Sequence, residues 1–443
     1  MSLIDRNLFE RVYVINLNSR PERWEAFKKR LPEDWPFQPP ERFPGIDGKL
    51  VPHPVWWKSG PGGWGCHRTH TRIHEECLNN GVNSVLICED DAVFVPDFTE
   101  KVESFIKHLP DDWEIVYFGG QHIQQELRLP RKVNDWVYQP FNVNRNHLVG
   151  LRGRRALELY FRHLTNYPDW KLPHHTDHRL GELHKTSPSG LYCPREWLAG
   201  QAEGHSDICG KELELRMFQG AEEIVYPKID LAGVAVMGAF GSGTSCLSGL
   251  LSHLGISMGK PREDTPPHLF CSFQDVYLGH ICRLAYIEPW LMEGCSYVDR
   301  TNHLRHWAGI QCQRNRSQSR FFGGKHPIMC LLGPELIDAW KDPFFICIDR
   351  PAVDCYNTTL HSRWGWHPHA IQHAIDFQLR TRENFLSEYS PRFLRVSFKR
   401  MMQCPENTIQ EICEFIGYQP DKSQYEQSLS FIKESAHATT LFL

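Results

Sequence analysis

Residues 85–91 read Val85-Leu86-Ile87-Cys88-Glu89-Asp90-Asp91, a short apolar run followed by three acids. A run of this length is typical of a strand that is buried on both faces. The acids then stand at the carboxyl end of the strand, where open α/β sheets bind their ligands. Adjacent carboxylates in a buried place repel one another unless a cation compensates them. The stretch therefore predicts a metal site at Glu89, Asp90 and Asp91, with a solvated strand end as the alternative.

Strands and helices alternate on both sides of this stretch. We expect a strand at residues 12–17, a helix across residues 66–79 and a further strand at residues 114–120. Strands that alternate with helices indicate a largely parallel sheet covered by helices. The first half of the chain is therefore predicted to be an α/β domain.

A second α/β unit is predicted to begin near residue 230. The polar stretch 211–219 gives way there to an apolar strand that starts at Leu231 and runs into a glycine-rich turn. The chain has 443 residues, which exceeds the size at which one hydrophobic core keeps growing. We expect two domains, at residues 1–228 and 229–443.

Composition and charge bear on nucleic-acid partners, membrane segments and the redox compartment. The net charge of −4 makes attraction of nucleic acid by the whole chain unfavourable, so no nucleic-acid partner is expected. No apolar run reaches the length of a transmembrane segment, and the N-terminus has no signal-peptide pattern. The 15 cysteines are scattered through apolar runs, which favours a reduced, cytoplasmic protein.

The chain also holds 24 histidines, and His67, His70 and His74 recur at helical spacing. Two helical ligands would need a cysteine or carboxylate to complete a structural zinc site, and no Cys-x-x-Cys pair supports one. Solvated or hydrogen-bonded histidines are therefore the favoured interpretation.

Short motifs surround the acidic stretch in a fixed order. They are Asn16 with Arg20 and Arg23, Gly45-Ile46-Asp47-Gly48, Gly65-Cys66-His67-Arg68-Thr69-His70, the acids themselves, Tyr117-Phe118-Gly119-Gly120, Asn146-His147, Asp177, the Tyr192-Pro194-Gln201 spacing and Ser206-Asp207. Over residues 10–210 this series resembles glycosyltransferase family 25, which contains lipopolysaccharide-type and procollagen galactosyltransferases. The resemblance implies a GT-A-like fold, a nucleotide-sugar donor (most simply a UDP-sugar), Mn²⁺ or Mg²⁺, and a saccharide or glycan acceptor.

The resemblance also implies roles for single residues. Asn16, Arg20 and Arg23 would lie at the nucleotide, Asp47 beside the donor pocket, His70 behind the metal-binding strand, and Asp177 on the acceptor side as a general base. The residues alone allow other roles: surface arginines, a turn aspartate, a buried hydrogen-bonded histidine and a helix N-cap. His67, Arg68 and Thr69 depart from the family pattern, so the donor and acceptor of the family do not transfer.

In the second half, an apolar strand at residues 234–237 precedes a glycine-rich loop and a helix with leucines at i, i+3, i+4 and i+7. Backbone N–H groups and the helix dipole favour an anion at such a place. The predicted phosphate-binding residues are Gly241, Ser242, Gly243, Thr244 and Ser245. Thr244 stands where a nucleotide-hydrolysing P-loop has lysine, which disfavours ATP or GTP hydrolysis. A tight turn that binds nothing is the alternative.

The motifs that follow the loop are Gly324-Lys325-His326-Pro327, Asp349-Arg350-Pro351 and the terminal Phe415-Ile416-Gly417. Over residues 231–435 they resemble bacterial sulfotransferase-like domains, which implies 3′-phosphoadenosine 5′-phosphosulfate as donor. By the spacing in that family, Arg350 and Thr358 would hold its 3′-phosphate, whereas an alignment on Pro351 selects Asp349 and Asn357. Lys325 would reach the bridging oxygen or the sulfonate. Gly241 departs from the family, which carries Lys or Arg before Ser-Gly-Thr.

Together these patterns predict a two-domain α/β transferase. A GT-A-like nucleotide-sugar-binding domain is followed by a P-loop, sulfotransferase-like domain with a mainly parallel sheet. The first domain is expected to move a sugar to a saccharide hydroxyl in glycan synthesis, and the second to transfer sulfate. The alternative is a nucleotide-binding scaffold that has lost catalysis, in particular in the second domain, where Gly241 removes a charge. A P-loop phosphotransferase is disfavoured by Thr244.

Overall fold

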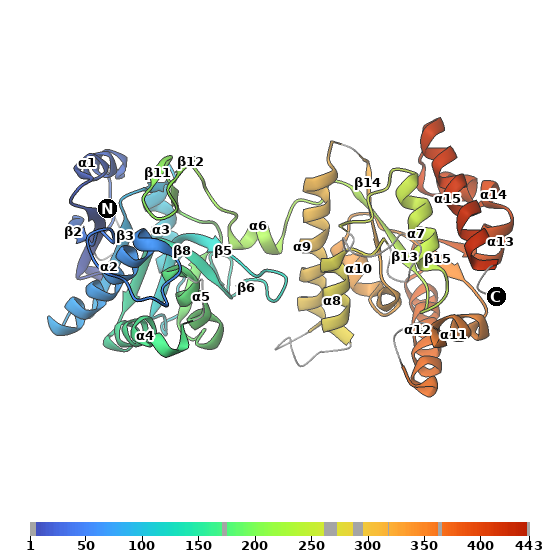
Figure 1. Ribbon diagram of the computed structural model, residues 1–443, viewed down its shortest axis with the longest axis horizontal. Coiled ribbons are helices and arrows are strands. Elements are labelled where there is room, and N and C mark those ends of the chain that lie inside the picture. Colours follow the sequence, from blue (N-terminus) through green and yellow to red (C-terminus); the bar gives the residue numbers. More distant parts are fainter. Residues whose placement is uncertain are drawn as a thin grey trace. The chain divides into compact units, whose positions relative to one another are not determined.

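The computed structural model describes residues 6–170, 175–260, 273–286, 296–317, 319–361 and 366–440. The chain divides into two compact units, Met1–Val225 and Tyr226–Leu443 (Figure 1). Each unit has its own sheet and its own core, so each is described by itself.

The first unit is built on an eight-stranded sheet with the order β2-β1-β3-β8-β5-β9-β7-β6. Its strands are β1 (Arg11–Leu17), β2 (Glu41–Gly45), β3 (Ser84–Glu89), β5 (Ile115–His122), β6 (Arg131–Lys132), β7 (Val137–Gln139), β8 (Val143–Arg152) and β9 (Leu191–Pro194). Two small antiparallel ribbons pair β4 (Ala92–Phe94) with β10 (Ala199–Gln201), and β11 (Gly204–Ser206) with β12 (Lys211–Leu213). The helices are α1 (Pro21–Arg30), α2 (Gly60–Asn79), α3 (Phe98–Lys107), α4 (Arg154–Thr165), α5 (Thr176–Thr186) and α6 (Ala221–Val225).

This sheet is mixed, whereas the sequence predicted a largely parallel one. β1 runs parallel to β2 and β3, but β8 runs antiparallel to both β3 and β5. A parallel return needs a crossover, usually a helix. Between β5 and β8 the chain forms only the short strands β6 and β7, so β8 returns in the opposite direction. The prediction was wrong because an apolar run does not encode the direction of its strand.

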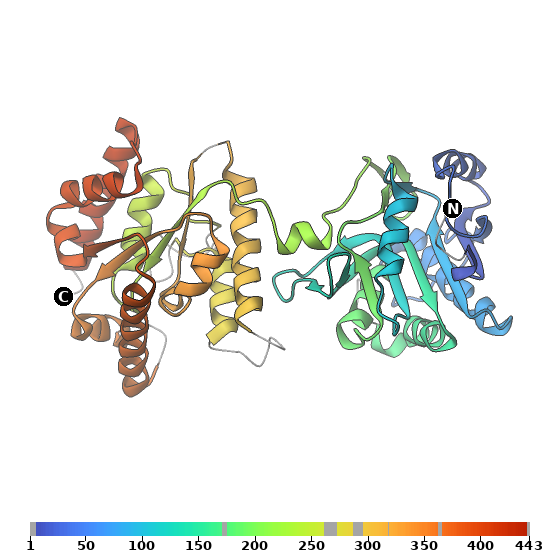
Figure 2. The same cartoon turned by 180° about the vertical axis from the view of Figure 1, so that it is seen from behind.

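The alternation along β3 places its side chains in two separate apolar clusters. Val85 and Ile87 pack with residues of α2 and α4, while Leu86 and Cys88 pack with residues of α1 and α3. Figure 2 shows α3 on the face of the sheet opposite to α2. The expected burial of this strand on both faces is confirmed, and it fixes where the chain emerges at Glu89.

The second unit contains a four-stranded sheet, β14-β13-β15-β16, in which all neighbours are parallel. Its strands are β13 (Ala232–Met237), β14 (Phe321–Lys325), β15 (Phe344–Asp349) and β16 (Phe393–Ser397). The helices are α7 (Thr244–His253), α8 (Val276–Tyr286), α9 (Tyr297–Asn315), α10 (Gly333–Ala339), α11 (Ala352–Leu360), α12 (Pro368–Tyr389), α13 (Phe398–Gln403), α14 (Pro405–Ile416) and α15 (Lys422–Thr440). The predicted parallel sheet of this unit is confirmed.

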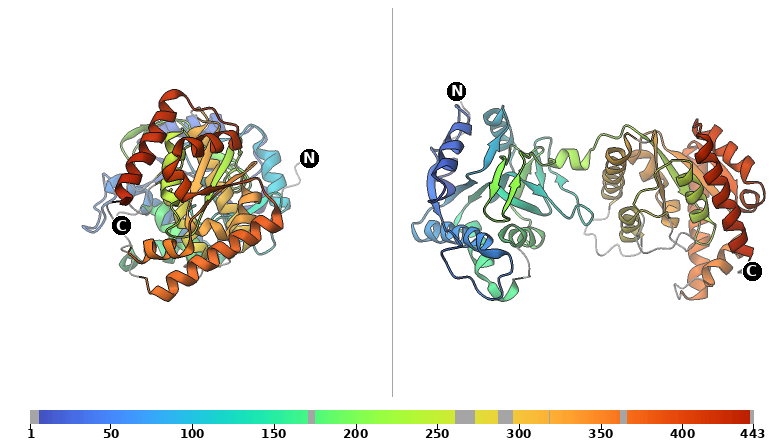
Figure 3. Two further views of the ribbon diagram at one scale, coloured as in Figure 1. Left: turned by 90° about the vertical axis from the view of Figure 1, so that its right-hand side faces the viewer. Right: turned by 45° about the horizontal axis from the view of Figure 1, so that its top comes forward.

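Helices cover both faces of this sheet. Val234 and Val236 face a cluster formed with α7, α14 and α15, and α7 lies against α15 (Figure 3). Ala235 and Met237 face the opposite cluster, to which α9, α10 and α12 contribute. Because β13, β14 and β15 are parallel, their carboxyl ends meet at one edge of the sheet, beside the loop that precedes α7.

Candidate active sites

The three consecutive acids of the first unit do not share one cluster. β3 ends at Glu89, and Asp90 and Asp91 lie in the turn that follows it, where Asp90 has partners of its own. Its Oδ2 accepts a hydrogen bond from Asn16 Nδ2 at 2.7 Å, and its Oδ1 lies 2.8 Å from Arg23 Nη2. Asp90 is thus held by two donors of the protein, in contrast to the expected joint metal site of all three acids.

Glu89 and Asp91 meet a histidine of the neighbouring strand. Nitrogen of His147 and oxygens of Glu89 and Asp91 lie within 4.8 Å of one another, and His147 Nδ1 is 3.3 Å from Glu89 Oε2. The register of β3 and β8 pairs Cys88 with Leu148, which carries Glu89 opposite His147. The sequence showed Asn146-His147 only as a motif. The sequence could not show that His147 meets these acids, because the antiparallel pairing of β8 with β3 cannot be read from it.

Burial and mutual contact together set the pKa values of the side chains in this cluster. Burial would raise the pKa of Glu89, but contact with His147 lowers it below its ordinary value. Burial would lower the pKa of His147, and Glu89 and Asp91 raise it instead. Asp91 Oδ1 is buried and accepts no hydrogen bond from any described residue. Two carboxylates, one of which carries this unsatisfied oxygen, and an imidazole form a donor set that fits a divalent cation.

Arg20 and Arg23 lie beside this cluster and are bridged by Asp207. Asp207 Oδ1 is 2.9 Å from Arg20 Nη2, and its Oδ2 is 3.5 Å from Arg23 Nη1. Arg23 also lies 3.6 Å from Asp91, so it links the two sides of the acidic stretch. Asn16 completes the group through Asp90. The structure therefore brings together the three residues that were predicted to lie at the nucleotide.

Asp177 lies near the same cluster, in the first turn of α5. Its Oδ1 accepts a hydrogen bond from Asn146 Nδ2 at 2.9 Å, and Asn146 Oδ1 accepts one from the Tyr117 hydroxyl at 3.1 Å. Burial, followed by the charge of Glu89, raises the pKa of Asp177 to about 7. The N-cap of α5 is His175, so the helix-capping alternative for Asp177 is not what the structure shows.

Asp47 and His70 have different surroundings. Asp47 Oδ1 accepts a hydrogen bond from the Lys49 backbone N–H at 2.9 Å, which is the turn role that its neighbouring glycine allowed. No described contact joins Asp47 to the acidic cluster. His70 is buried on α2, and one of its ring nitrogens lies close to Glu89. His67 and His74 are buried on the same helix, so none of the three is solvated.

In the second unit, Lys325 ends β14 and reaches the glycine-rich loop. Its register partner on β13 is Val236, one residue before the end of that strand. The Lys325 side chain is buried, and its Nζ donates a hydrogen bond to Ser245 Oγ at 2.9 Å. Ser242 and Thr244 are also buried in this loop. An ammonium group is therefore fixed at the start of α7.

Gly241 occupies a place where no side chain fits. Its φ is +76°, and a Cβ atom there would lie 2.3 Å from the Cys355 carbonyl oxygen on α11. Gly243 has a φ of +97° and packs against Phe398. Arg350, which follows β15, donates a hydrogen bond from Nη1 to the Gly241 carbonyl at 2.9 Å. Positive charge thus reaches the loop from neighbouring strand ends instead of from residue 241.

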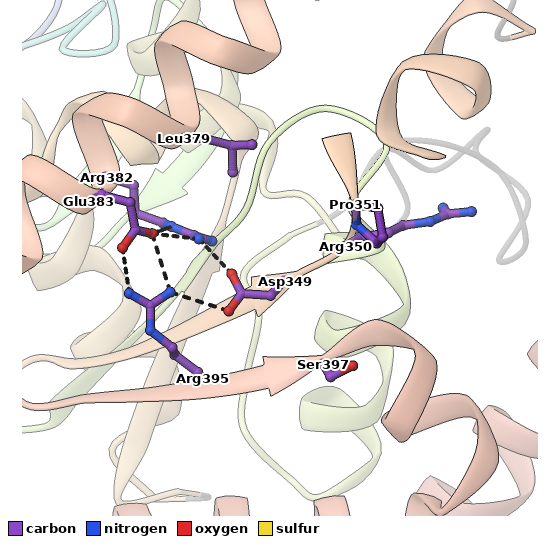
Figure 4. Close-up of a pocket in the computed structure, with 8 residues that line it drawn as sticks. All are labelled: Asp349, Arg350, Pro351, Leu379, Arg382, Glu383, Arg395 and Ser397. Atoms are coloured by element: carbon purple, nitrogen blue, oxygen red, sulfur yellow. Dashed lines mark hydrogen bonds and ion pairs between the residues drawn. The ribbon is translucent and has the colours of Figure 1, made fainter. Parts of the chain in front are cut away.

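A pocket of about 490 Å³ lies beside Arg350, between β15, β16 and α12 (Figure 4). It is lined by Asp349, Arg350, Pro351, Leu379, Arg382, Glu383, Arg395 and Ser397. Arg382 and Arg395 form ion pairs with Asp349 and Glu383, while Arg350 points away from that group.

These contacts place the residues of the two alignments in different surroundings. Asp349 is engaged by Arg382 at 2.6 Å, and Arg350 is the residue that reaches the loop. Thr358 lies half-buried on α11 and makes no side-chain hydrogen bond with the described residues. The geometry therefore joins Arg350, but not Thr358, to the glycine-rich loop.

Two family models match this chain, one in each of its two units. Residues 9–146 match the model of Glycosyltransferase family 25 (LPS biosynthesis protein), and residues 234–422 match that of the Sulfotransferase family. The chain carries a glycosyltransferase family 25 domain followed by a sulfotransferase-family domain.

Curated members of glycosyltransferase family 25 match this chain only over short segments. Probable inactive glycosyltransferase 25 family member 3 of Bos taurus is 25% identical over 27% of this chain and 23% of its own length. Procollagen galactosyltransferase 1 of Danio rerio is 24% identical over 34% of this chain and 29% of its own length. The matched segments thus span less than a third of either relative.

Among solved structures, the chain is similar to the Sulfotransferase Domain from the Curacin Biosynthetic Pathway. The identity is 13% and the TM-score 0.31, over 44% of this chain and 77% of that one. Across the described ranges, no helix combines the length and apolar character that a membrane crossing requires.

Proposed function

We propose that the glycosyltransferase domain transfers a sugar from a nucleotide-sugar donor, a UDP-sugar, to a saccharide hydroxyl in a metal-dependent reaction. The observation that carries this proposal is the meeting of Glu89, Asp91 and His147 at the carboxyl end of β3. These residues would hold Mn²⁺ or Mg²⁺, and the imidazole favours Mn²⁺ because Mg²⁺ prefers oxygen ligands. When bound, the cation supplies charge neutralisation for the departing nucleoside diphosphate.

The arginines would bind the nucleotide. Arg20 and Arg23 keep 32% and 26% of their side chains exposed while they pair with Asp207. Two oxygens of an incoming diphosphate can accept parallel hydrogen bonds from a planar guanidinium, as a carboxylate does, so the diphosphate can share or replace Asp207. Asn16 would act through Asp90, whose orientation it sets together with Arg23.

Asp177 would accept the proton of the acceptor hydroxyl. Its raised pKa, about 7, suits a general base that works near neutral pH. Asn146 holds one carboxyl oxygen of Asp177, and Tyr117 holds Asn146. The chain of hydrogen bonds would keep the other oxygen directed at the acceptor.

Thermal-shift measurements with UDP-, GDP- and CMP-sugars, with and without Mn²⁺, test this function. We expect stabilisation by one sugar nucleotide that depends on Mn²⁺ and is lost in Asp91→Asn. The matched control is Asp111→Asn, which removes the same charge from an exposed position. Absence of any metal-dependent stabilisation would refute the proposed donor site.

For the second domain, we propose binding of 3′-phosphoadenosine 5′-phosphosulfate and transfer of its sulfuryl group to a hydroxyl. The bond between sulfur and the bridging oxygen breaks, a bond to the acceptor oxygen forms, the hydroxyl proton leaves, and adenosine 3′,5′-bisphosphate remains. The supporting observation is the buried Lys325, whose ammonium group lies at the loop and can stabilise the 5′-phosphate that departs. By the spacing of the family, Arg350 would bind the 3′-phosphate, and its guanidinium lies beside the loop at the Gly241 carbonyl.

Calorimetry with adenosine 3′,5′-bisphosphate tests the second site. We expect binding by the full chain and a loss of at least about tenfold in affinity in Lys325→Met, because a charge-assisted contact disappears. Lys341→Met, at an exposed position, is the control. Binding without any sulfuryl transfer would support the second candidate, a nucleotide-binding domain without catalysis, and no binding would refute both.

A further inference from the structure

The acidic cluster has a second set of potential ligands on its other side. Cys66 and His70 lie one turn apart on α2, at i and i+4, so both side chains leave the same face of that helix. A sulfur of Cys66, a ring nitrogen of His70 and an oxygen of Glu89 lie within 4.8 Å of one another. This set differs from the first because it contains a thiol.

His70 gives independent evidence for a ligand. Its side chain is 1% exposed, and its Nε2 has no hydrogen-bond partner among the described residues. A buried polar atom without a partner is costly, and buried polar groups in native proteins are normally satisfied. A metal ion bound between the thiol, the imidazole and the carboxylate would satisfy this nitrogen.

We propose that Cys66, His70 and Glu89 form a zinc site, separate from the oxygen-rich site at Asp91 and His147. One sulfur, one nitrogen and one carboxylate oxygen are ligands that Zn²⁺ accepts in tetrahedral geometry, with the fourth position left for water or a substrate atom. Binding deprotonates the Cys66 thiol and releases that proton to solvent. Glu89 belongs to both sites, and each of its two oxygens can serve one of them.

The sequence disfavoured zinc at the helical histidines because it contains no Cys-x-x-Cys pair. The structure supplies the third ligand from β3. A helix that carries two ligands and a strand that carries the third are brought together only by the fold. The site would also tie the amino-terminal part of α2 to the strand end that holds the donor metal.

Cobalt spectroscopy on the metal-free full chain tests the proposal, because Co²⁺ bound to a thiolate has a sulfur-to-metal charge-transfer band. We expect this band to saturate at one equivalent and to be lost when Zn²⁺ is added. Cys66→Ala should lose the band. Cys77→Ala should keep it, since Cys77 is a buried cysteine about three turns further along the same helix.

Two further variants make the outcome decisive. Asp91→Asn should keep the band although it loses Mn²⁺-dependent stabilisation by the sugar nucleotide, so failure of the proposed transfer activity and failure of this site are distinguishable. His70→Gln should weaken Co²⁺ binding by at least about tenfold, which serves if Cys66→Ala does not fold by circular dichroism. A wild-type protein without the band, or a band that survives in Cys66→Ala, overturns the proposal.

Discussion

Asp90 and Asp91 are adjacent in the chain, yet their side chains lie in different environments. Asp90 is held by Asn16 and Arg23, and its pKa is raised to about 6 by burial, against the opposing effect of Arg23. Asp91 instead faces His147 and carries an unsatisfied oxygen. At the residue scale, function in this domain therefore depends on which side of the strand end a carboxylate occupies.

Burial of the Asp177 carboxyl lowers the stability of the folded protein by an amount that depends on pH. Its pKa is raised from 3.8 to about 7 in the folded, metal-free protein. Between those values the native state holds a proton that the unfolded state has lost, so this group lowers stability as pH rises through the window. We expect Asp177→Asn to exceed wild type in stability by about 4 kcal/mol near pH 8, and the gain to shrink toward pH 4.

Urea unfolding in the presence of a chelator, at several pH values, measures this difference. Asp111→Asn, at an exposed position, should show no comparable trend. A gain in stability that does not change with pH would contradict the raised pKa of Asp177.

Gly241 permits a sharper test, because restoring the basic residue of the family should damage the domain. Arg at this position would need a φ of +76° and would place Cβ 2.3 Å from the Cys355 carbonyl oxygen. We expect Gly241→Arg to lose several kcal/mol of stability, well above the ~1 kcal/mol typical of backbone strain alone.

Gly417→Ala is the control for the strain that a positive φ alone imposes on a residue with a side chain. Gly417 has a φ of +67°, but a Cβ there would meet nothing within 4 Å. Denaturant unfolding of both variants separates conformational strain from collision with α11. Equal losses in the two variants would show that α11 does not restrict residue 241.

At the scale of elements, α12 is attached to β15 by ion pairs of unequal burial. Arg382 and Arg395 both contact Asp349 and Glu383, but their side chains are 3% and 42% exposed. Arg382 also donates a hydrogen bond to the buried Ile348 carbonyl, which its removal leaves unsatisfied, whereas an exposed ion pair contributes little. We expect Arg382→Met to cost about 2 kcal/mol and Arg395→Met less than about 1 kcal/mol.

Thermal or urea unfolding of the two variants gives the comparison directly. Each substitution removes one guanidinium group from the same network, so each serves as the control for the other. Similar losses in both would contradict the assignment of the attachment to Arg382.

Elements whose pattern is local could be predicted from the sequence. The leucines of residues 247–254 define α7 by their spacing, and the apolar run of residues 85–88 defines β3. The partners of these elements could not be predicted, because pairing direction and register arise from contacts distant in the chain. His147, which depends on the antiparallel pairing of β8, and the Cys66–His70–Glu89 set were missed for that reason.

At the scale of the whole molecule, each unit contains a complete sheet with apolar clusters on both faces. A ligand that binds one folded unit stabilises that unit by mass action. We expect scanning calorimetry to resolve two transitions, with UDP-sugar and Mn²⁺ raising the temperature of one and adenosine 3′,5′-bisphosphate that of the other.

Two variants show which thermal transition belongs to which unit. Asp91→Asn should abolish only the first shift, and Lys325→Met should reduce only the second. A single transition that both ligands raise would contradict independent folding of the two units.

The close approach of Gly241 to α11 also limits how the charge of this loop can be engineered. A side chain at residue 241 would collide with the Cys355 carbonyl oxygen unless α11 moved. Lys325 and Arg350 reach the loop from neighbouring strand ends instead. Redesign of the loop for a different anion therefore starts at those two positions.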